Sequence, residues 1–221
     1  MRQRKVRNLE EKISEHRRWF VEGNGEVKGK WKEVFGNEND LFFEIGAGKG
    51  QFLIGQAGMH PDKNFVGVEG RASVMLRGLQ KLDSTSMSNV RFALGFIYNP
   101  EELFSENELA GIYLNFSDPW PKIRHSERRL THRDILRRYF SVLKEGGFIE
   151  IKTDSGELFD FTEREATEGV PGLFRIDRYS RDLHSSGYDA KNVTSEYEDK
   201  FVAAGKNIYY IRLVKDYSKS E

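Results

Sequence analysis

The feature of this chain that most constrains its fold is an apolar strand that ends in a glycine turn. Residues 42–50 read FFEIGAGKG, and residues 51–54 begin a helical pattern. Glycine lets the backbone turn sharply and approach a ligand with no Cβ in the way. Glu69 ends the next predicted strand about 20 residues on, the distance at which a Rossmann-like unit presents a carboxylate to ribose hydroxyls. Together these features predict a nucleoside-binding α/β domain.

The spacing of the glycines separates classes of nucleotide. The turn reads Gly46-x-Gly48-x-Gly50, whereas a dinucleotide fold has GxGxxG, whose third glycine would fall at Gln51. A P-loop requires Ser or Thr after its Gly-Lys pair, and here a glycine follows. Glu44 would repel a pyrophosphate but attract a cation, such as the sulfonium or ammonium of S-adenosylmethionine. The alternative is an ordinary strand-to-helix turn.

Apolar runs alternate with helical patterns from residue 41 onward, which predicts βαβ units and a mainly parallel sheet. Strands are predicted at 41–46, 65–69, 90–94, 111–116, 148–153, 174–178 and 208–214, and helices at 51–57, 72–82, 133–143 and 157–165. A chain of 221 residues suits one such domain. We expect residues 31–221 to form it, after a basic N-terminal extension at 1–30. The polar segment 180–205 is either a functional insertion near the site or an irregular surface helix and loop.

Composition excludes several classes of function. Lys and Arg number 35, as do Asp and Glu, so nucleic-acid binding must come from local clusters such as Arg2, Arg4, Lys5 and Arg7. The absence of cysteine excludes disulfides and thiolate chemistry, and the five histidines lack metal-ligand spacing, so we expect no catalytic metal. No apolar run approaches the roughly 20 residues that span a bilayer, and no signal peptide follows Met1. We therefore expect a soluble, cytoplasmic protein.

A second segment, residues 115–129, joins an Asp-Pro-Trp-Pro turn to a run of basic side chains. The two prolines stiffen the turn and fix Asp118 beside Trp120, an arrangement that suits a flat, polar ring such as a base. The basic side chains that follow would lie beside a phosphate backbone; they are Lys122, Arg124, His125, Arg128 and Arg129. The alternative is a solvated, charged loop ahead of a helix.

With these segments in order, the chain resembles the bacterial tRNA (guanine-N7)-methyltransferase family over nearly its whole length. The resemblance lies in GKWKEVFGN, FEIGAGKGQF, FVGVE, YLNFSDPWPKIRHSERRL, FIEIKTD and SEYEDKF. It implies a Rossmann-like class I methyltransferase fold, with a seven-stranded, mainly parallel sheet, an antiparallel last strand and helices on both faces. It also implies S-adenosylmethionine as donor and a variable-loop guanine of tRNA as acceptor. Some members of that family dimerise, so the resemblance allows a homodimer.

The resemblance also assigns roles to matching residues. It implies that Asp118 is the catalytic carboxylate and also contacts the cofactor, as do Glu44, Gly46, Gly48, Gly50 and Glu69. Substrate contacts are implied for Lys122, Asp154, Ser195, Glu196, Tyr197 and Glu198, and contacts to the RNA backbone for Arg124, His125, Arg128 and Arg129. The chain departs from the family at Phe96 and Ile97, where an Asp-Ala pair usually contacts the adenine amino group.

The chemistry needs no general base, because guanine N7 has a free lone pair and no hydrogen. We expect Asp118 to orient the guanine and stabilise the positive charge that develops on its ring. Two other interpretations stay open. One is a methyltransferase that acts on another RNA or on a protein side-chain amide. The other is a non-catalytic RNA-binding protein with a decayed cofactor site, which Phe96 favours and which Glu44 and Glu69 weigh against.

Overall fold

The computed structural model describes residues 7–22, 25–96 and 99–216. Its strands are β1 (Phe20–Val21), β2 (Leu41–Ile45), β3 (Asn64–Glu69), β4 (Val90–Leu94), β5 (Leu109–Asn115), β6 (Leu143–Thr153), β7 (Phe174–Ser180) and β8 (Tyr209–Lys215). Its α-helices are α1 (Leu9–Ser14), α2 (Trp31–Phe35), α3 (Gln51–Met59), α4 (Ala72–Leu82), α5 (Arg133–Val142), α6 (Gly156–Arg164) and α7 (Glu196–Ala203). None of the helices in these ranges is both long and apolar enough to cross a membrane.

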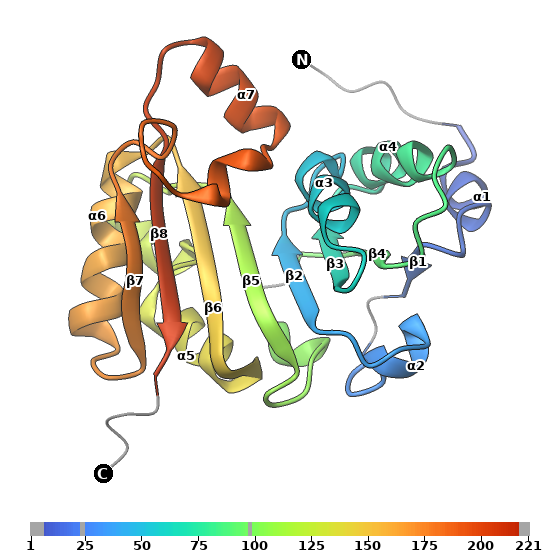
Figure 1. Cartoon of the computed structure of the whole chain (residues 1–221), viewed down its shortest axis with the longest axis horizontal. Helices are drawn as coiled ribbons and strands as arrows, with labels where there is room; N and C mark the ends of the chain where they lie inside the picture. Colours follow the sequence, from blue (N-terminus) through green and yellow to red (C-terminus); the bar gives the residue numbers. More distant parts are fainter. Residues whose placement is uncertain (1–6, 23–24, 97–98, 217–221) are drawn as a thin grey trace.

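The strands form a single sheet in the order β1-β4-β3-β2-β5-β6-β8-β7 (Figure 1). Pairs from β1 to β6 are parallel, whereas β8 runs antiparallel to both β6 and β7. This confirms the predicted α/β class, the mainly parallel sheet and the antiparallel last strand. The expected count of seven strands is corrected to eight in the described part of the chain, because β1 adds a short edge strand. A two-residue strand has no periodicity that a sequence pattern could show.

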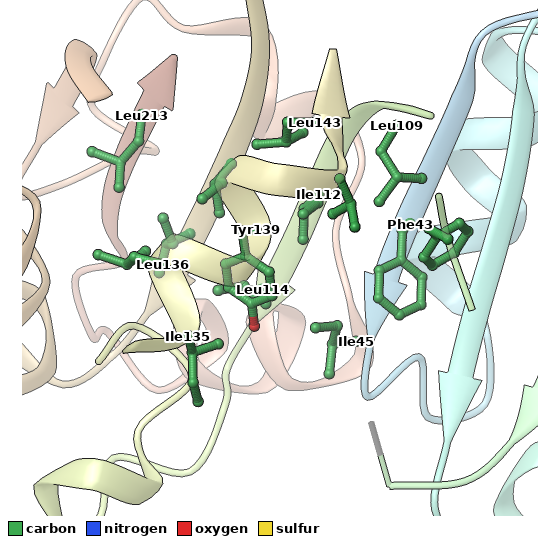
Figure 2. Packing of buried hydrophobic residues seen from close by; sticks show 14 of the residues in the cluster. Phe43, Ile45, Leu109, Ile112, Leu114, Ile135, Leu136, Tyr139, Leu143 and Leu213 are labelled. Carbon is green, nitrogen blue, oxygen red and sulfur yellow. The ribbon is translucent and has the colours of Figure 1, made fainter. Parts of the chain in front are cut away.

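Two apolar clusters cover the two faces of the sheet, because successive side chains of a strand point to opposite faces. On one face, β-strand residues such as Phe43 and Ile112 pack against α5 and α6, and Figure 2 shows Ile135, Leu136 and Tyr139 of α5 in this layer. On the other face, Phe42, Phe65, Phe92 and Tyr113 pack against residues of α1, α3 and α4. The domain therefore has three layers, with helices on both faces as expected.

The described part of the N-terminal segment belongs to this core. The Trp19 side chain is buried, and its Nε1 donates to the Met87 carbonyl at 2.8 Å. The Phe92 amide donates to the Trp19 carbonyl, which starts the pairing of β1 with β4. His16 Nε2 lies 3.1 Å from Asp83 Oδ2 at the end of α4. These contacts tie α1 and β1 to the sheet edge; Arg2, Arg4 and Lys5 lie outside the described residues.

Candidate active site

The acidic residues predicted at the cofactor and the base lie at or after the ends of four neighbouring parallel strands, β3, β2, β5 and β6 (Figure 1). Glu44 and Glu69 lie at the carboxyl ends of β2 and β3, and Asp118 and Asp154 follow β5 and β6. From β2 the chain passes to β3 and β4 on one side, then returns to β5 on the other side. Open α/β sheets bind ligands at such a switch point, outside the carboxyl ends of the strands.

The glycine turn after β2 leaves space for a ligand. Gly46, Gly48 and Gly50 have φ values of 77°, 58° and 74°, a region that other residues rarely adopt. A Cβ on Gly50 would lie 2.6 Å from the Phe92 ring, whereas one on Gly46 would meet no atom within 4 Å. Gly50 therefore serves the packing of α3 on the sheet, and Gly46 faces an open space.

Glu69 fixes the shape of this turn. Its side chain is buried, and its Oε2 accepts from the Gly48 amide at 3.1 Å, while Oε1 accepts from the Arg71 amide at 2.9 Å. Each carboxylate oxygen has a second lone pair. The carboxylate can therefore hold the glycine turn and accept hydrogen bonds from ribose hydroxyls together.

Glu44 is buried with half of its carboxylate unpaired. Its side chain is 2% exposed; Asn115 Nδ2 donates to Oε1 at 2.9 Å, and Oε2 has no partner. Burial raises the pKa of Glu44 to about 7, while the Asn115 hydrogen bond lowers it, nearby Glu196 raises it and Lys152 lowers it. An unpaired carboxylate oxygen inside a protein is costly. A cationic ligand would remove that cost, so the residues present fit an amino-acid cofactor with positive charge.

The Asp-Pro-Trp-Pro turn is held by a hydrogen bond from Arg129, which follows it in the chain. Trp120 has a φ of 41°, and its carbonyl accepts from Arg129 Nη2 at 3.1 Å. Arg129 is buried, pairs with Glu157 at 2.7 Å and lies over the Phe161 ring. The guanidinium therefore lies inside the fold, with its Nε buried and without a hydrogen-bond partner among the described residues, and the RNA contact expected of Arg129 stays a prediction. The sequence places it in a basic run and gives no sign that it points inward.

The other basic residues of this segment stay on the surface. Lys122, Arg124 and Arg128 are exposed, and His125 is partly exposed. Arg128 lies over the Trp120 ring, with 5.1 Å between its Cζ and the ring centroid. Asp118 is exposed beside them. One short segment therefore carries an exposed carboxylate, an aromatic ring and exposed cations, and the roles expected of them stay predictions.

The segment with Ser195 to Glu198 begins α7, which lies over the end of the sheet (Figure 1). Ser195 caps the helix by accepting from the Glu198 amide at 3.2 Å. Glu198 is 0% exposed, with Oε2 3.0 Å from Lys152 Nζ and Oε1 2.9 Å from His184 Nε2. Both its oxygens are therefore paired inside the protein, and the substrate contact expected of Glu198 stays a prediction. Its neighbour Tyr197 is exposed.

Further contacts hold the α7 segment against the glycine turn and the strands. Gln51 Nε2 donates to Asp199 Oδ2 at 2.7 Å, and Lys81 Nζ lies 2.9 Å from Glu196 Oε1. Lys152 Nζ also donates to the Val193 carbonyl at 2.9 Å. Asp154, which is also expected to contact the substrate, pairs with Lys206 at 2.7 Å.

Sequence reasoning missed Asn115, Gln51, Lys81 and Lys152. Lys152 carried a signal, because a lysine within an apolar, parallel strand is almost never buried without a partner. Gln51 stands in the sequence only as the position where a dinucleotide fold has its third glycine, with no sign of its bond to Asp199. Phe96 is exposed, and Ile97 lies outside the described residues. Within residues 7–22, 25–96 and 99–216 there is no cluster of three side chains that could ligate a metal ion.

A family model and three proteins that match this chain are all methyltransferases. A family model described as "Putative methyltransferase" matches residues 38–211. A tRNA (guanine-N(7)-)-methyltransferase of Brevibacillus brevis is 41% identical over 96% of this chain and 97% of its own length. A protein of the same name from Listeria monocytogenes is 43% identical over 86% and 87% of the two chains. A solved antibiotic-related methyltransferase has a TM-score of 0.62 at 21% identity, covering 84% of this chain and 92% of that one, which supports the fold alone.

Proposed function

The chain belongs to the tRNA (guanine-N7)-methyltransferase family, and we propose that it transfers a methyl group from S-adenosylmethionine to N7 of a guanine in the variable loop of tRNA. One observation carries this proposal. A buried carboxylate with an unpaired oxygen, Glu44, lies beside an open glycine turn and next to the strand that leads to Asp118. A site for a cationic methyl donor and a site for a base thus share one edge of the sheet.

The donor side would use Glu44 and Glu69 for different parts of the cofactor. Glu69 is anchored by two backbone amides and suits the ribose hydroxyls. Glu44 has an unpaired oxygen and suits the ammonium group or the sulfonium. When bound, the cofactor supplies an electrophilic methyl group on a positively charged sulfur. Glu44, if ionised, attracts that charge, and Gly46 leaves room for it.

The acceptor side would use positioning and charge rather than proton abstraction. The N7 lone pair can attack the methyl carbon directly, and no proton leaves N7. The guanine ring becomes cationic as the bond forms, so a carboxylate fixed nearby lowers the barrier. Asp118 follows β5 on a turn stiffened by two prolines and by Arg129, which would keep that carboxylate in place. We assign Asp118 the role of orienting and stabilising the guanine.

The RNA backbone would lie along the exposed cations beside this turn. Lys122, Arg124 and Arg128 lie on the surface next to Asp118, while the net charge of the chain is zero. A local basic cluster binds phosphates and positions a nucleic acid without reading its sequence. Such a cluster also explains how a protein of zero net charge can bind an anionic substrate.

The test is single-turnover transfer of labelled methyl from S-adenosylmethionine to unmodified tRNA. Borohydride and aniline treatment then cleaves the RNA at N7-methylguanine. We expect cleavage in the variable loop. Label on another atom, or in a protein, would favour a different methyltransferase, and tight tRNA binding without transfer would favour the non-catalytic interpretation.

The role of Asp118 is tested by Asp118→Asn, which keeps the shape of the side chain and removes its charge. Loss of one group that stabilises transition-state charge lowers kcat by about 10²–10³-fold. We expect a fall of that size with little change in the tRNA dissociation constant. Lys122→Gln is the matched control on the same turn, and it should weaken tRNA binding instead. Full turnover by Asp118→Asn would contradict the assignment.

A further inference from the structure

Phe96 is an apolar side chain exposed to an unusual degree beside the cofactor site. It is 72% exposed and follows the end of β4. The amide of Gly95 donates to the main-chain carbonyl of Glu69 at 3.1 Å, so the backbone of this segment is fixed beside the end of β3. An aromatic ring left in water at a ligand site costs free energy, which suggests that something covers it.

The Phe96 ring lies directly on Gly70. A Cβ built on Gly70 would be 2.2, 2.3 and 2.5 Å from ring atoms Cε1, Cζ and Cδ1 of Phe96. The ring can take this place only because residue 70 has no side chain. Gly70 lies between Glu69 and Arg71, whose amide donates to the Glu69 carboxylate. The ring therefore borders the turn that holds that carboxylate.

We propose that Phe96 forms the stacking surface for the adenine ring of the cofactor, and that this chain recognises the base by its π-face rather than by its 6-amino group. The inference rests on the proposed function, which places the ribose at Glu69. Base and ribose are joined by one bond, so a ribose at Glu69 brings the base to the neighbouring turn. Leu94, Gly95 and Phe96 offer no side-chain acceptor for an amino group.

Stacking and hydrogen bonding predict different responses to a change in the base. Every base has a π-face, so stacking tolerates the loss of the amino group. A site that accepts a hydrogen bond from the amino group rejects the analogue that lacks it, because its own polar group is left unpaired. S-adenosylhomocysteine and its analogue with hydrogen in place of the 6-amino group differ in this one group, keep ring N1 as an acceptor, and undergo no methyl transfer.

The experiment measures dissociation constants of these two ligands by isothermal titration calorimetry. We expect the wild-type chain to bind both within about threefold, since stacking tolerates any base. Phe96→Ala should weaken both about tenfold, the loss typical of one base-stacking contact, and Phe96→Tyr should restore binding. Met59→Ala, which removes another exposed apolar side chain far along α3, should change neither constant.

Gly70→Ala tests the structural basis of the proposal. The new methyl group must displace the Phe96 ring, which is the free end of a flexible side chain, so the backbone can stay in place. We expect Gly70→Ala to weaken S-adenosylhomocysteine binding in the wild-type chain and to have no effect in the Phe96→Ala background.

Two results would overturn this inference and leave the proposed function intact. The first is that Phe96→Ala binds both ligands as tightly as the wild type. The second is that the wild type prefers S-adenosylhomocysteine over the analogue without the amino group by more than about 30-fold, which would require a hydrogen-bond acceptor for that group. If the wild-type chain binds neither ligand, the proposed function fails as well.

Discussion

The buried pair of Lys152 and Glu198 gives the sharpest test of how the α7 segment is held. Lys152 is 1% exposed and Glu198 is 0% exposed, and their charged atoms lie 3.0 Å apart. Lys152→Met keeps the length of the side chain and removes its charge. Glu198 then stays buried with His184 as its remaining side-chain partner, and the Val193 carbonyl loses its donor.

The expected cost follows from the burial of both groups. Removing one partner of a buried ion pair costs about 3–5 kcal/mol, because the other charge is left uncompensated. At about 2–4 °C per kcal/mol for a domain of this size, the melting temperature should fall by roughly 6–20 °C. Replacing both partners by apolar residues removes the uncompensated charge. Lys152→Met with Glu198→Met should therefore recover much of the lost stability.

The assay is urea unfolding of the two single variants and the double variant, followed by far-ultraviolet circular dichroism. Lys81→Met is the matched control, because it breaks the pair with Glu196 on the same segment, where Lys81 is 41% and Glu196 is 26% exposed. An ion pair near the surface contributes about 0–1 kcal/mol. The reasoning is refuted if Lys152→Met costs no more than Lys81→Met, or if the costs of the two single substitutions simply add in the double variant.

Two further predictions concern charge at the site. The pKa of Glu44 is raised from 4.5 to about 7, so the stability that its proton provides is complete below pH 4.5 and is lost as the pH rises through 7. At pH 8 the free energy of unfolding of Glu44→Gln, measured in urea, should therefore exceed that of the wild type by up to about 3 kcal/mol. At pH 4.5 we expect no such gain. Equal differences at both pH values would contradict this prediction. Arg129→Ala should destabilise the fold in urea unfolding, because it removes the hydrogen bond to the Trp120 carbonyl and the pair with Glu157. Arg128→Ala should leave unfolding unchanged and reduce the salt dependence of tRNA binding by about one ion. Filter binding of tRNA across a salt series measures this dependence for Arg128→Ala and the wild type. An equal slope of log K against log salt for the two proteins would count against a phosphate contact of Arg128.

The sequence predicted the sheet because the strands depend on local patterns, and the site residues that it predicts stay predictions. The spacing of Gly46, Gly48 and Glu69 is the local pattern from which a nucleoside site is predicted. The seven longer strands show as apolar runs bounded by turn residues. Strand β1 was not predicted, because two residues are too few to show an alternating pattern. Its pairing with β4 depends on packing of Trp19 against a distant loop.

The roles of charged residues could not be predicted from the sequence, because burial separates residues that look alike there. Arg128 and Arg129 are neighbours in one basic run, yet Arg128 lies on the surface and Arg129 points inward to Glu157. Glu196 and Glu198 likewise differ, since only Glu198 meets the buried Lys152. These partners lie far away in the sequence, and only the fold brings them together.

If this chain methylates N7 of a variable-loop guanine, replacing that one atom should abolish methyl transfer. A tRNA made with 7-deazaguanosine at the position mapped by aniline cleavage has a carbon in place of N7 and keeps the groups that pair with other bases. We expect it to bind with unchanged affinity and to accept no labelled methyl group, while 7-deazaguanosine at another position leaves transfer intact. Label transferred to the substituted tRNA at the wild-type rate would contradict the account.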